Sequence, residues 1–435
     1  MGESVSVRKL LVKKIGVMLR TNQPGRLRRL FKSGWRAAVI CFGVWVLPCP
    51  AFANMVRVET SLGVIDIELF DTAAPATVAN FLTYVQSAAF DGTFFHRSVP
   101  GFVIQGGGYR WNTASNTVAP VPANAPVVNE FSATRSNLRG TVAMAKLGGD
   151  PNSATSQWFV NLADNAANLD HQNGGFTVFG KVVGNGMTVV DALAKWPVYS
   201  VNFGLSIGTL TGVPVDLAGS TSITAANLAM VTRATLLPTR TLSLLPGWNL
   251  AGNGSDAPLN VSTAFADAQR FVTVWKWVAG ASGGFWAFYA PALAAQGGQV
   301  LADYAASKGY QVLESIQAGE GFWVNVAQNQ ASVLTVPYGN AVTSGALSSV
   351  LQPGWNLAAI GTTTPPQQFV TAQTSAVTTL WAWDSARSQW YFYAPDLAAK
   401  GGMVLTDYIA SKSYLDFATE SKSLGFGVGF WVNRP

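Results

Sequence analysis

The sequence predicts a mainly β protein: a closed antiparallel barrel with two helices, followed by two small β-rich repeat domains. In residues 55–237, short runs of alternating apolar and polar residues are separated by turn residues, which is typical of strands. Two segments of that region show helical spacing of apolar residues. After residue 240 a block of sequence occurs twice. A chain of 435 residues is long enough for two or three domains.

The first 53 residues have the features of a cleavable signal peptide for export. They hold ten of the 28 Lys and Arg residues and one acidic residue. The basic region precedes an apolar run at residues 37–48, and residues 51–53 (Ala-Phe-Ala) form a small-x-small cleavage site. We therefore expect a mature chain that begins at Asn54 and lacks a stable membrane span, located in the periplasm or outside the cell. Met18 is an alternative translation start.

Charge and cysteine content exclude several functional classes. The formal net charge is +6, but without residues 1–53 the chain has 18 basic and 21 acidic residues. We therefore expect no nucleic-acid partner. Cys41 and Cys49 both precede the cleavage site, so the mature chain has no thiol or disulfide. The sequence contains no Ser/His/Asp arrangement and no metal-ligand spacing, so we expect neither a cofactor nor a metal.

The barrel region is predicted to begin with a hairpin over residues 55–70 and then a helix. Pro75 suits the first turn of that helix, and apolar residues recur at Val78, Phe81, Leu82 and Val85. Further strands are predicted on both sides of Pro100-Gly101 and at residues 129–131, 138–144, 157–161, 176–183 and 229–237. A second helix is predicted at residues 187–193, and residues 111–126 are predicted to be a long surface loop.

The stretch 91–108 (DGTFFHRSVPGFVIQGGG) places a cation, Arg97, among apolar residues. Its β-favouring residues predict two short strands joined at Pro100-Gly101, so Arg97 should lie on a sheet. A guanidinium in such surroundings either pairs with a carboxylate or is kept for a ligand. We expect His96 to have a structural role. Glycines 106–108 lack the context of a phosphate loop, and we expect them to allow close backbone packing.

Two blocks of sequence together resemble the cyclophilin family of peptidyl-prolyl cis/trans isomerases. The first is FHRSVPGFVIQGG at residues 95–107. The second, within residues 140–181, contains Met144-Ala145, the run DPNSATSQ at 150–157, Trp158-Phe159-Val160, Leu169-Asp170 and Val178-Phe179-Gly180-Lys181. The resemblance covers residues 55–237. It implies a cyclophilin-like barrel that binds proline-containing polypeptides and needs no cofactor.

The resemblance also implies the roles of individual residues. Arg97 and Gln105 are the expected catalytic residues, with Arg97 aimed at the prolyl nitrogen. The expected substrate-binding residues are Phe102, Val103, Ala145, Lys146, Leu147, Gln157, Phe159, Asn168, Leu169 and Phe176. Residues 145–147 are expected to form an edge strand that pairs with the substrate before its proline. This chain departs from common members of the family at four of these positions. It has Asn168 in place of tryptophan and Lys146 in place of asparagine. It has Val103 in place of methionine and Phe176 in place of the histidine of eukaryotic members. These departures affect the expected substrate preference more than turnover.

The C-terminal part consists of two repeats, at residues 244–328 and 349–435. Their matching segments are Gly247-Trp248-Asn249-Leu250 with Gly354-Trp355-Asn356-Leu357, Trp275-Lys276-Trp277 with Trp381-Ala382-Trp383, Phe288-Tyr289-Ala290-Pro291 with Phe392-Tyr393-Ala394-Pro395, and Gly321-Phe322-Trp323-Val324-Asn325 with Gly429-Phe430-Trp431-Val432-Asn433. The repeats resemble tryptophan-rich β repeats at the ends of secreted bacterial proteins. Large aromatic residues usually form the core of such small domains. The alternative is that Trp277, Trp286, Tyr289, Trp383, Trp390 and Tyr393 face outward and stack on sugars or a protein.

Two functions remain open from the sequence. The first is an exported peptidyl-prolyl isomerase that assists the folding of exported proteins and is tethered or targeted by its repeats. The second is a non-catalytic protein whose barrel grips proline-containing segments, while the repeats bind a glycan or another cell-surface partner. Turnover by the barrel distinguishes the two.

Overall fold

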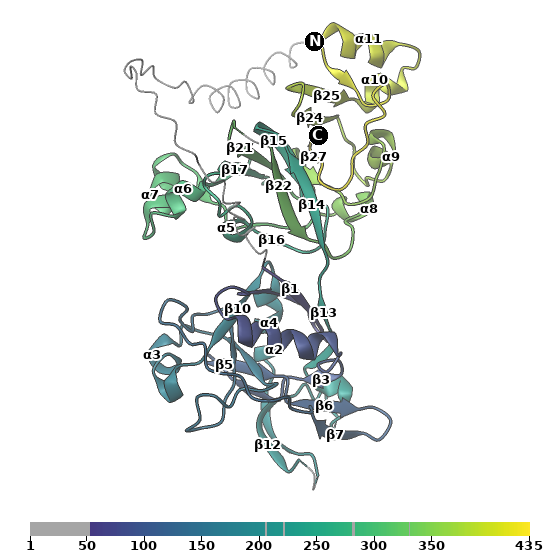
Figure 1. Cartoon of the computed structure of the whole chain (residues 1–435). Coiled ribbons are helices and arrows are strands. Elements are labelled where there is room, and N and C mark those ends of the chain that lie inside the picture. The colour runs from purple at the N-terminus through teal and green to yellow at the C-terminus, as the bar shows by residue number, and fades with distance from the viewer. Residues whose placement is uncertain (1–52, 205–206, 221, 281–282, 330) are drawn as a thin grey trace, which may run out of the picture. The chain divides into compact units, whose positions relative to one another are not determined.

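A computed structural model describes residues 53–204, 207–220, 222–280, 283–329 and 331–435 (Figure 1). The basic and apolar parts of the predicted signal peptide, both cysteines and Met18 lie outside these residues. The described chain is mainly β, which confirms the predicted fold class. None of the helices in these ranges is long and apolar enough to span a bilayer.

The N-terminal domain is built on one eleven-stranded antiparallel sheet. Its order is β4-β5-β9-β8-β10-β2-β1-β13-β3-β6-β7, with β4 and β7 at the two ends, so the barrel is a half-barrel. The strands are β1 (Met55–Thr60), β2 (Gly63–Leu69), β3 (Thr93–Phe94), β4 (Arg97–Val99), β5 (Val103–Gly106), β6 (Tyr109–Asn112), β7 (Thr117–Pro120), β8 (Thr141–Met144), β9 (Trp158–Asn161), β10 (Val178–Val183) and β13 (Met230–Leu236). The helices are α2 (Pro75–Gln86), α3 (Ala166–Leu169) and α4 (Gly186–Ala194), with 3-10 turns η1 (Gln172–Gly174) and η2 (Ala225–Asn227).

Helix α2 begins at Pro75, as predicted, and its N-terminus is capped from a distant loop. The carboxylate of Glu130 accepts bonds from the backbone N–H groups of Ala76 and Thr77, at 3.1 and 2.8 Å. These N–H groups have no partner within the helix, and a negative charge is favourable at this end. The apolar face of α2, including Phe81, packs into a core cluster with Trp158. The position of α2 is thus fixed by the cap at its N-terminus and by the packing of its apolar face.

Three segments of the domain differ from the sequence prediction. Residues 129–131, predicted to be a strand, form none. Residues 111–126, predicted to be a loop, contain the hairpin β6–β7, in which Trp111 lies opposite Val118 and both are buried. Burial of this cross-strand apolar pair stabilises the hairpin, although the Asn, Pro and Thr content of the segment had predicted a loop. A second unpredicted hairpin consists of β11 (Val198–Asn202) and β12 (Thr209–Pro214).

Each repeat contains a five-stranded sheet with the same order. The first sheet has the order β15-β21-β17-β18-β19 and the second β23-β27-β24-β25-β26. Their strands are β15 (Gly247–Gly252), β17 (Phe271–Val278), β18 (Phe285–Tyr289), β19 (Gln311–Val312), β21 (Gly321–Val326), β23 (Gly354–Ala359), β24 (Thr379–Asp384), β25 (Gln389–Tyr393), β26 (Leu415–Asp416) and β27 (Gly429–Arg434). Two further pairs are β14 (Thr239–Leu244) with β22 (Ser332–Pro337) and β16 (Leu259–Asn260) with β20 (Ser315–Ile316). The helices are α5 (Val261–Ala264), α6 (Pro291–Ala294), α7 (Val300–Ser307), α8 (Ser344–Leu347), α9 (Pro366–Thr371), α10 (Pro395–Ala399) and α11 (Val404–Ser411).

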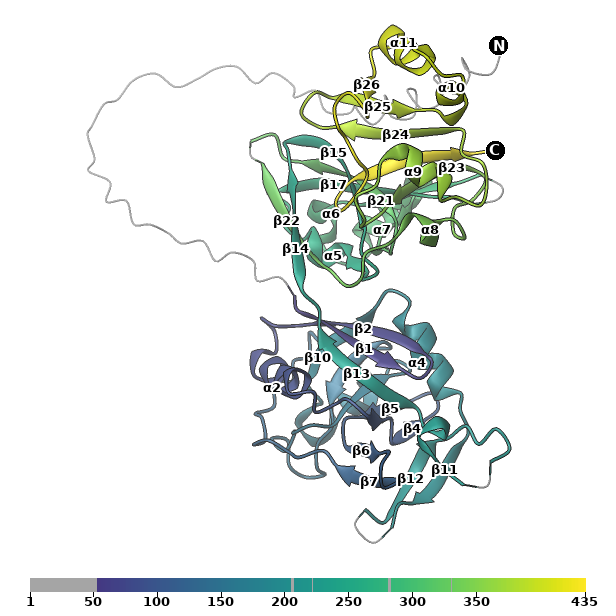
Figure 2. The same cartoon turned by 90° about the vertical axis from the view of Figure 1, so that its right-hand side faces the viewer.

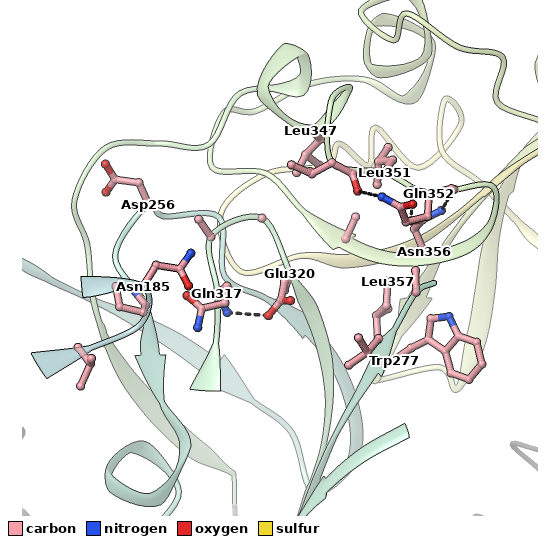
Figure 3. A pocket seen from close by; sticks show the side chains of 18 of the residues that line it. Asn185, Asp256, Trp277, Gln317, Glu320, Leu347, Leu351, Gln352, Asn356 and Leu357 are labelled. Carbon is pink, nitrogen blue, oxygen red and sulfur yellow. Dashed lines mark hydrogen bonds between the residues drawn. The ribbon is translucent and has the colours of Figure 1, made fainter. Parts of the chain in front are cut away.

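The asparagine of each Gly-Trp-Asn-Leu motif holds a turn. Asn356 is buried; its side-chain Nδ2 donates to the carbonyl of Gln352 at 2.7 Å, and its Oδ1 accepts from the backbone N–H of Gln352 at 2.8 Å (Figure 3). Asn249 makes the same two bonds with Leu245. A buried amide that satisfies the turn backbone in both copies explains why the motif occurs twice.

The indole rings of one repeat pack against those of the other. The ring centroid of Trp431 lies 6.3 Å from that of Trp277 and 6.0 Å from that of Trp286. In the reciprocal contact, Trp323 lies 5.8 Å from both Trp383 and Trp390. Edge and tilted contacts of this kind add to the energy of burying the rings. Trp323 and Trp431 are buried and the four tryptophans around them are half-buried, so their rings form a shared aromatic core at its centre and leave no flat outward-facing platform.

We predict that Trp431→Ala destabilises the repeats by about 3–5 kcal/mol, because it leaves a large cavity among the remaining indoles. Trp323→Ala, the matching change in the other repeat, should have a similar effect. Urea unfolding followed by tryptophan fluorescence measures both. Met403→Ala, which changes a 60% exposed side chain, is the control and should shift stability by less than about 0.5 kcal/mol. Equal stability of Trp431→Ala and the control would contradict the shared core.

Candidate active site

The predicted catalytic arginine lies at the end of a row of side chains that crosses five strands. Arg97 of β4 is opposite Gln105 of β5, Gln105 is opposite Phe159 of β9, and Phe159 is opposite Ala143 of β8. Ala143 is in turn opposite Val178 of β10. Directly opposite residues of an antiparallel sheet point to the same face with Cβ atoms about 5 Å apart. The row therefore joins a cation to an apolar surface.

Most of the predicted proline pocket belongs to one apolar cluster on this face. Val103, Phe159 and Leu169 are buried in it, together with Ala143 and Val178, and Phe70, Phe102, Ala145 and Phe176 are partly buried against it. The rings of Phe159 and Phe176 meet edge to face at 5.9 Å. Asn168, beside Leu169 in α3, is exposed. The structure thus brings together the wall residues that the resemblance implied.

Within the described residues, the guanidinium of Arg97 has no hydrogen bond or ion pair, and the side chain is only partly buried. Arginines 57, 139 and 387, in contrast, are paired with carboxylates. A cation next to an apolar cluster and without a counter-ion retains its full capacity to donate to a bound molecule.

The two predicted glutamines bind each other. Gln105 Nε2 donates to Gln157 Oε1 at 2.7 Å, and Gln157 is close enough to His96 to raise the pKa of that imidazole against the effect of burial. In the described chain Gln105 makes no hydrogen bond to Arg97, so it contributes to the position of Arg97 only through strand pairing. The chain of contacts from His96 to Gln105 instead fixes the orientation of both amides.

Residues 145–147 differ from the expected edge strand. Strand β8 ends at Met144, and the backbone of the next residues is already in use. The N–H of Ala145 bonds to Gln157, the N–H of Leu147 to Ser153, and the carbonyl of Leu147 accepts from Asn173. The backbone groups of this segment that remain free to pair with a substrate are therefore mainly those of Lys146.

The ammonium of Lys146 is held over the loop that carries Phe176. It donates to the carbonyls of Asn173 and Gly175 at 2.8 and 2.7 Å and lies 4.8 Å from the ring centroid of Phe176. Burial lowers the pKa of Lys146, whereas the nearby Asp150 acts in the opposite direction. Lys146 therefore fixes one wall of the predicted pocket.

A buried chain of amides supports the same wall and was not predicted from the sequence. Asn165 Nδ2 donates to the carbonyl of Phe102 and to Asn161 Oδ1, both at 2.8 Å. Asn161 Nδ2 donates to Asn137 Oδ1 at 3.2 Å, and Asn137 Nδ2 donates to Asp170 at 2.8 Å. Burial raises the pKa of Asp170, but the hydrogen bonds from Asn137 lower it further, so the pKa stays below its usual value. The chain connects Phe102 with the Leu169-Asp170 loop.

The three glycines after Gln105 allow close packing, as predicted. Gly107 has a φ of +78°, and a Cβ there would lie 2.5 Å from the carbonyl oxygen of Ser156. At Gly108 a Cβ would lie 2.9 Å from the ring of His96 and 3.0 Å from the amide of Gln157. Side chains at these positions would displace the groups that orient the two glutamines.

His96 is a buried neutral imidazole next to the predicted catalytic residue. Burial lowers the pKa of His96 to about 4, and the charge of Arg97 acts in the same direction, whereas the bond to Gln157 opposes it. Its ring meets that of Tyr109 edge to face at 4.9 Å, and its Nδ1 has no partner in the described chain. The expected structural role agrees with this packing.

A large pocket lies elsewhere in the protein. It has a volume of about 780 Å³ and is lined by residues that include Trp277, Gln317 and Asn356 (Figure 3). None of the residues predicted for the isomerase site lines it. The chemistry of the strand row, not the size of a pocket, therefore identifies the candidate site.

We predict that His96 of the folded protein titrates near pH 4. An unfolded imidazole titrates at about 6.5, so between these values the unfolded state binds more protons. The contribution of His96 to the free energy of unfolding is therefore fully present above pH 6.5. As the pH falls to 4, the free energy of unfolding decreases by up to about 3 kcal/mol. NMR titration of a His171→Gln protein, which retains one imidazole, measures the midpoint. A midpoint at 6 or above would be inconsistent with the buried neutral ring.

Comparison with known proteins identifies the family of the N-terminal domain. Residues 55–206 match the family described as cyclophilin type peptidyl-prolyl cis-trans isomerase/CLD. A peptidyl-prolyl cis-trans isomerase of Acinetobacter baylyi is 44% identical over 164 residues, which cover 37% of this chain and 83% of the relative. Peptidyl-prolyl cis-trans isomerase A of Dickeya dadantii is 45% identical over 152 residues, which cover 34% of this chain and 76% of the relative.

Among solved structures, a cyclophilin type peptidyl-prolyl cis-trans isomerase of Cryptosporidium parvum matches 43% of this chain and 99% of its own, with 23% identity and a TM-score of 0.32. The identity to the bacterial enzymes and the share of their length that is covered establish the relationship. The chain therefore belongs to the cyclophilin family, and its N-terminal domain is a peptidyl-prolyl cis-trans isomerase.

Proposed function

We propose that this isomerase accelerates the folding of exported polypeptides by lowering the barrier to rotation about their X-Pro bonds, with Arg97 as the catalytic group. The observation that carries the proposal is that, among the described residues, the guanidinium of Arg97 has neither a hydrogen bond nor an ion pair, in a row of strand residues that leads to the apolar cluster. A buried ion pair at this position would have compensated the positive charge and engaged part of its donors.

The proposed chemistry needs no nucleophile. The planar amide resists rotation with a barrier of about 18–20 kcal/mol, because rotation breaks its resonance. In the twisted transition state the prolyl nitrogen carries a localised lone pair and becomes a hydrogen-bond acceptor. A donor fixed near that nitrogen binds the twisted form better than either planar isomer and so accelerates rotation in both directions. Arg97 supplies the donor in this proposal.

The apolar cluster is proposed to hold the proline ring while the preceding residue turns. Phe102, Val103, Phe159 and Leu169 would form the walls, and Phe176 would close the side next to Lys146. Gln105 and Gln157, already oriented by each other and by His96, would contact the substrate backbone. Proline-containing polypeptides are therefore the proposed partners, and neither a cofactor nor a metal enters the mechanism.

Export and cleavage before Asn54 are part of the proposal, and one contact supports them. The backbone N of Asn54 lies 2.8 Å from one carboxylate oxygen of Asp71, and its side-chain Nδ2 lies 2.6 Å from the other. Cleavage after Ala53 would turn that backbone N–H into an ammonium beside a carboxylate. A charge-assisted bond of this kind is stronger than one from a neutral amide.

The repeats are proposed to tether or target the enzyme at a cell-surface or glycan partner. The contacts of Trp277, Trp286, Trp383 and Trp390 with indoles of the other repeat do not favour sugar stacking on these rings. Tyr304, at 42% exposure on α7, is more accessible. We therefore place a partner on the helical side of a repeat rather than on the tryptophan cluster.

We predict that Arg97→Ala lowers kcat/KM at least roughly 100-fold, because removal of one fixed transition-state donor has effects of this size. A protease-coupled assay of the full chain with an X-Pro peptide measures it. Arg233→Ala removes an exposed arginine of β13 and should leave turnover unchanged. Wild-type turnover in Arg97→Ala would refute the assigned role, and absence of turnover in the unmodified protein would favour the non-catalytic binder.

A second prediction concerns the new N-terminus. Protein recovered from the compartment to which it is exported should begin at Asn54, as determined by N-terminal sequencing. In this processed protein Asp71→Asn should reduce stability by up to about 1 kcal/mol, since the pair is partly exposed. The loss should be smaller when further residues precede Asn54, because the ammonium is then absent. A different first residue would overturn the proposed cleavage site.

A further inference from the structure

The hairpin β11–β12 lies against the strand that carries Arg97. Strand β4 is one end of the eleven-stranded sheet, and β12 packs along it (Figure 2). The family match ends at residue 206, before β12 begins at Thr209. The element next to the proposed catalytic arginine therefore lies outside the part of the chain that the family describes.

The hairpin is firmly anchored to the barrel. Val213 and Val215 are fully buried in a cluster with Phe94, the last residue of β3. Phe203 directly follows β11, the other strand of the hairpin, and its ring centroid lies 5.7 Å from that of Phe94. Because Phe94 precedes Arg97 by three residues, the hairpin and the catalytic strand share a rigid attachment.

Gly212 of strand β12 lies close to Arg97. Its φ is +76°, and the pairing of β11 with β12 shifts register between Tyr199 and Val201, as at a β-bulge. A Cβ on Gly212 would lie 3.3 Å from the carbonyl oxygen of Ser98 and 3.9 Å from Cγ of Arg97. The methylene groups of Arg97 therefore pack beside the backbone of Gly212, where no side chain intervenes.

We propose that the β11–β12 hairpin positions Arg97, with Gly212 as the positioning residue. The charged end of Arg97 has no hydrogen bond or ion pair in the described chain, so side-chain contacts must restrict its conformation. The hairpin backbone at Gly212 lies beside the methylene stem of Arg97, and Gln105 lies opposite Arg97 on the neighbouring strand β5. Holding a catalytic group in one geometry before the substrate binds increases kcat. This inference rests on the proposed role of Arg97.

The chain offers a matched pair of variants for the test. Gly208, in the turn of the same hairpin, has a φ of +74°, and a Cβ there would meet nothing within 4 Å. Gly208→Ala and Gly212→Ala therefore both place an L side chain at a positive φ, but only the second adds a methyl group that crowds the carbonyl of Ser98 and contacts Cγ of Arg97. We expect Gly212→Ala to lower kcat about tenfold with little change in KM, whereas Gly208→Ala retains wild-type kinetics.

A double-mutant cycle separates positioning from general damage to the fold. In the Arg97→Ala background, Gly212→Ala should cause no further loss of activity, because the group that it positions is absent. The guanidinium NMR signal of Arg97 should shift in Gly212→Ala and not in Gly208→Ala. Equal kinetics of the two glycine variants, or an additive loss in the double variant, would overturn the inference. If Arg97→Ala itself retains turnover, the proposed function fails instead.

Discussion

Cross-strand pairing of Arg97 with Gln105, and of Gln105 with Phe159, is the interaction on which the site depends. It places a cation and an apolar surface side by side without a carboxylate between them. A partly exposed guanidinium tolerates this arrangement because water still solvates its charged end, whereas a fully buried one would need a partner. The sheet thus positions the charge by its stem and backbone, and its donors stay available.

The walls around this row are held by hydrogen bonds from polar side chains to the backbone and to one another. Asn137, Asn161 and Asn165 are buried and bonded to one another, and they join the carbonyl of Phe102 to the loop of Leu169. Lys146 does the same for the loop of Phe176. Each buried amide is costly unless it is satisfied, so a complete chain of bonds specifies one arrangement of the pocket.

Local patterns in the sequence predicted the helix that begins at Pro75, the repeats and, through the family resemblance, the apolar cluster. What was missed depends on contacts between distant segments. Glu130 caps a helix more than 50 residues away, and the three asparagines lie in separate segments that resemble ordinary loop and strand-end residues. In the β11–β12 hairpin, glycines at positions 208 and 212 interrupt the alternation of apolar residues by which strands are recognised.

The neutral state of His96 explains how a histidine can neighbour the arginine that is proposed as the catalytic group. A protonated imidazole would be a second positive charge next to Arg97 and could no longer accept hydrogen bonds through either ring nitrogen. Burial and the charge of Arg97 both oppose protonation, and the edge contact with Tyr109 fills the space that water would need. His96 therefore adds no second positive charge beside Arg97 at neutral pH, and the Gln105–Gln157 bond can orient both amides.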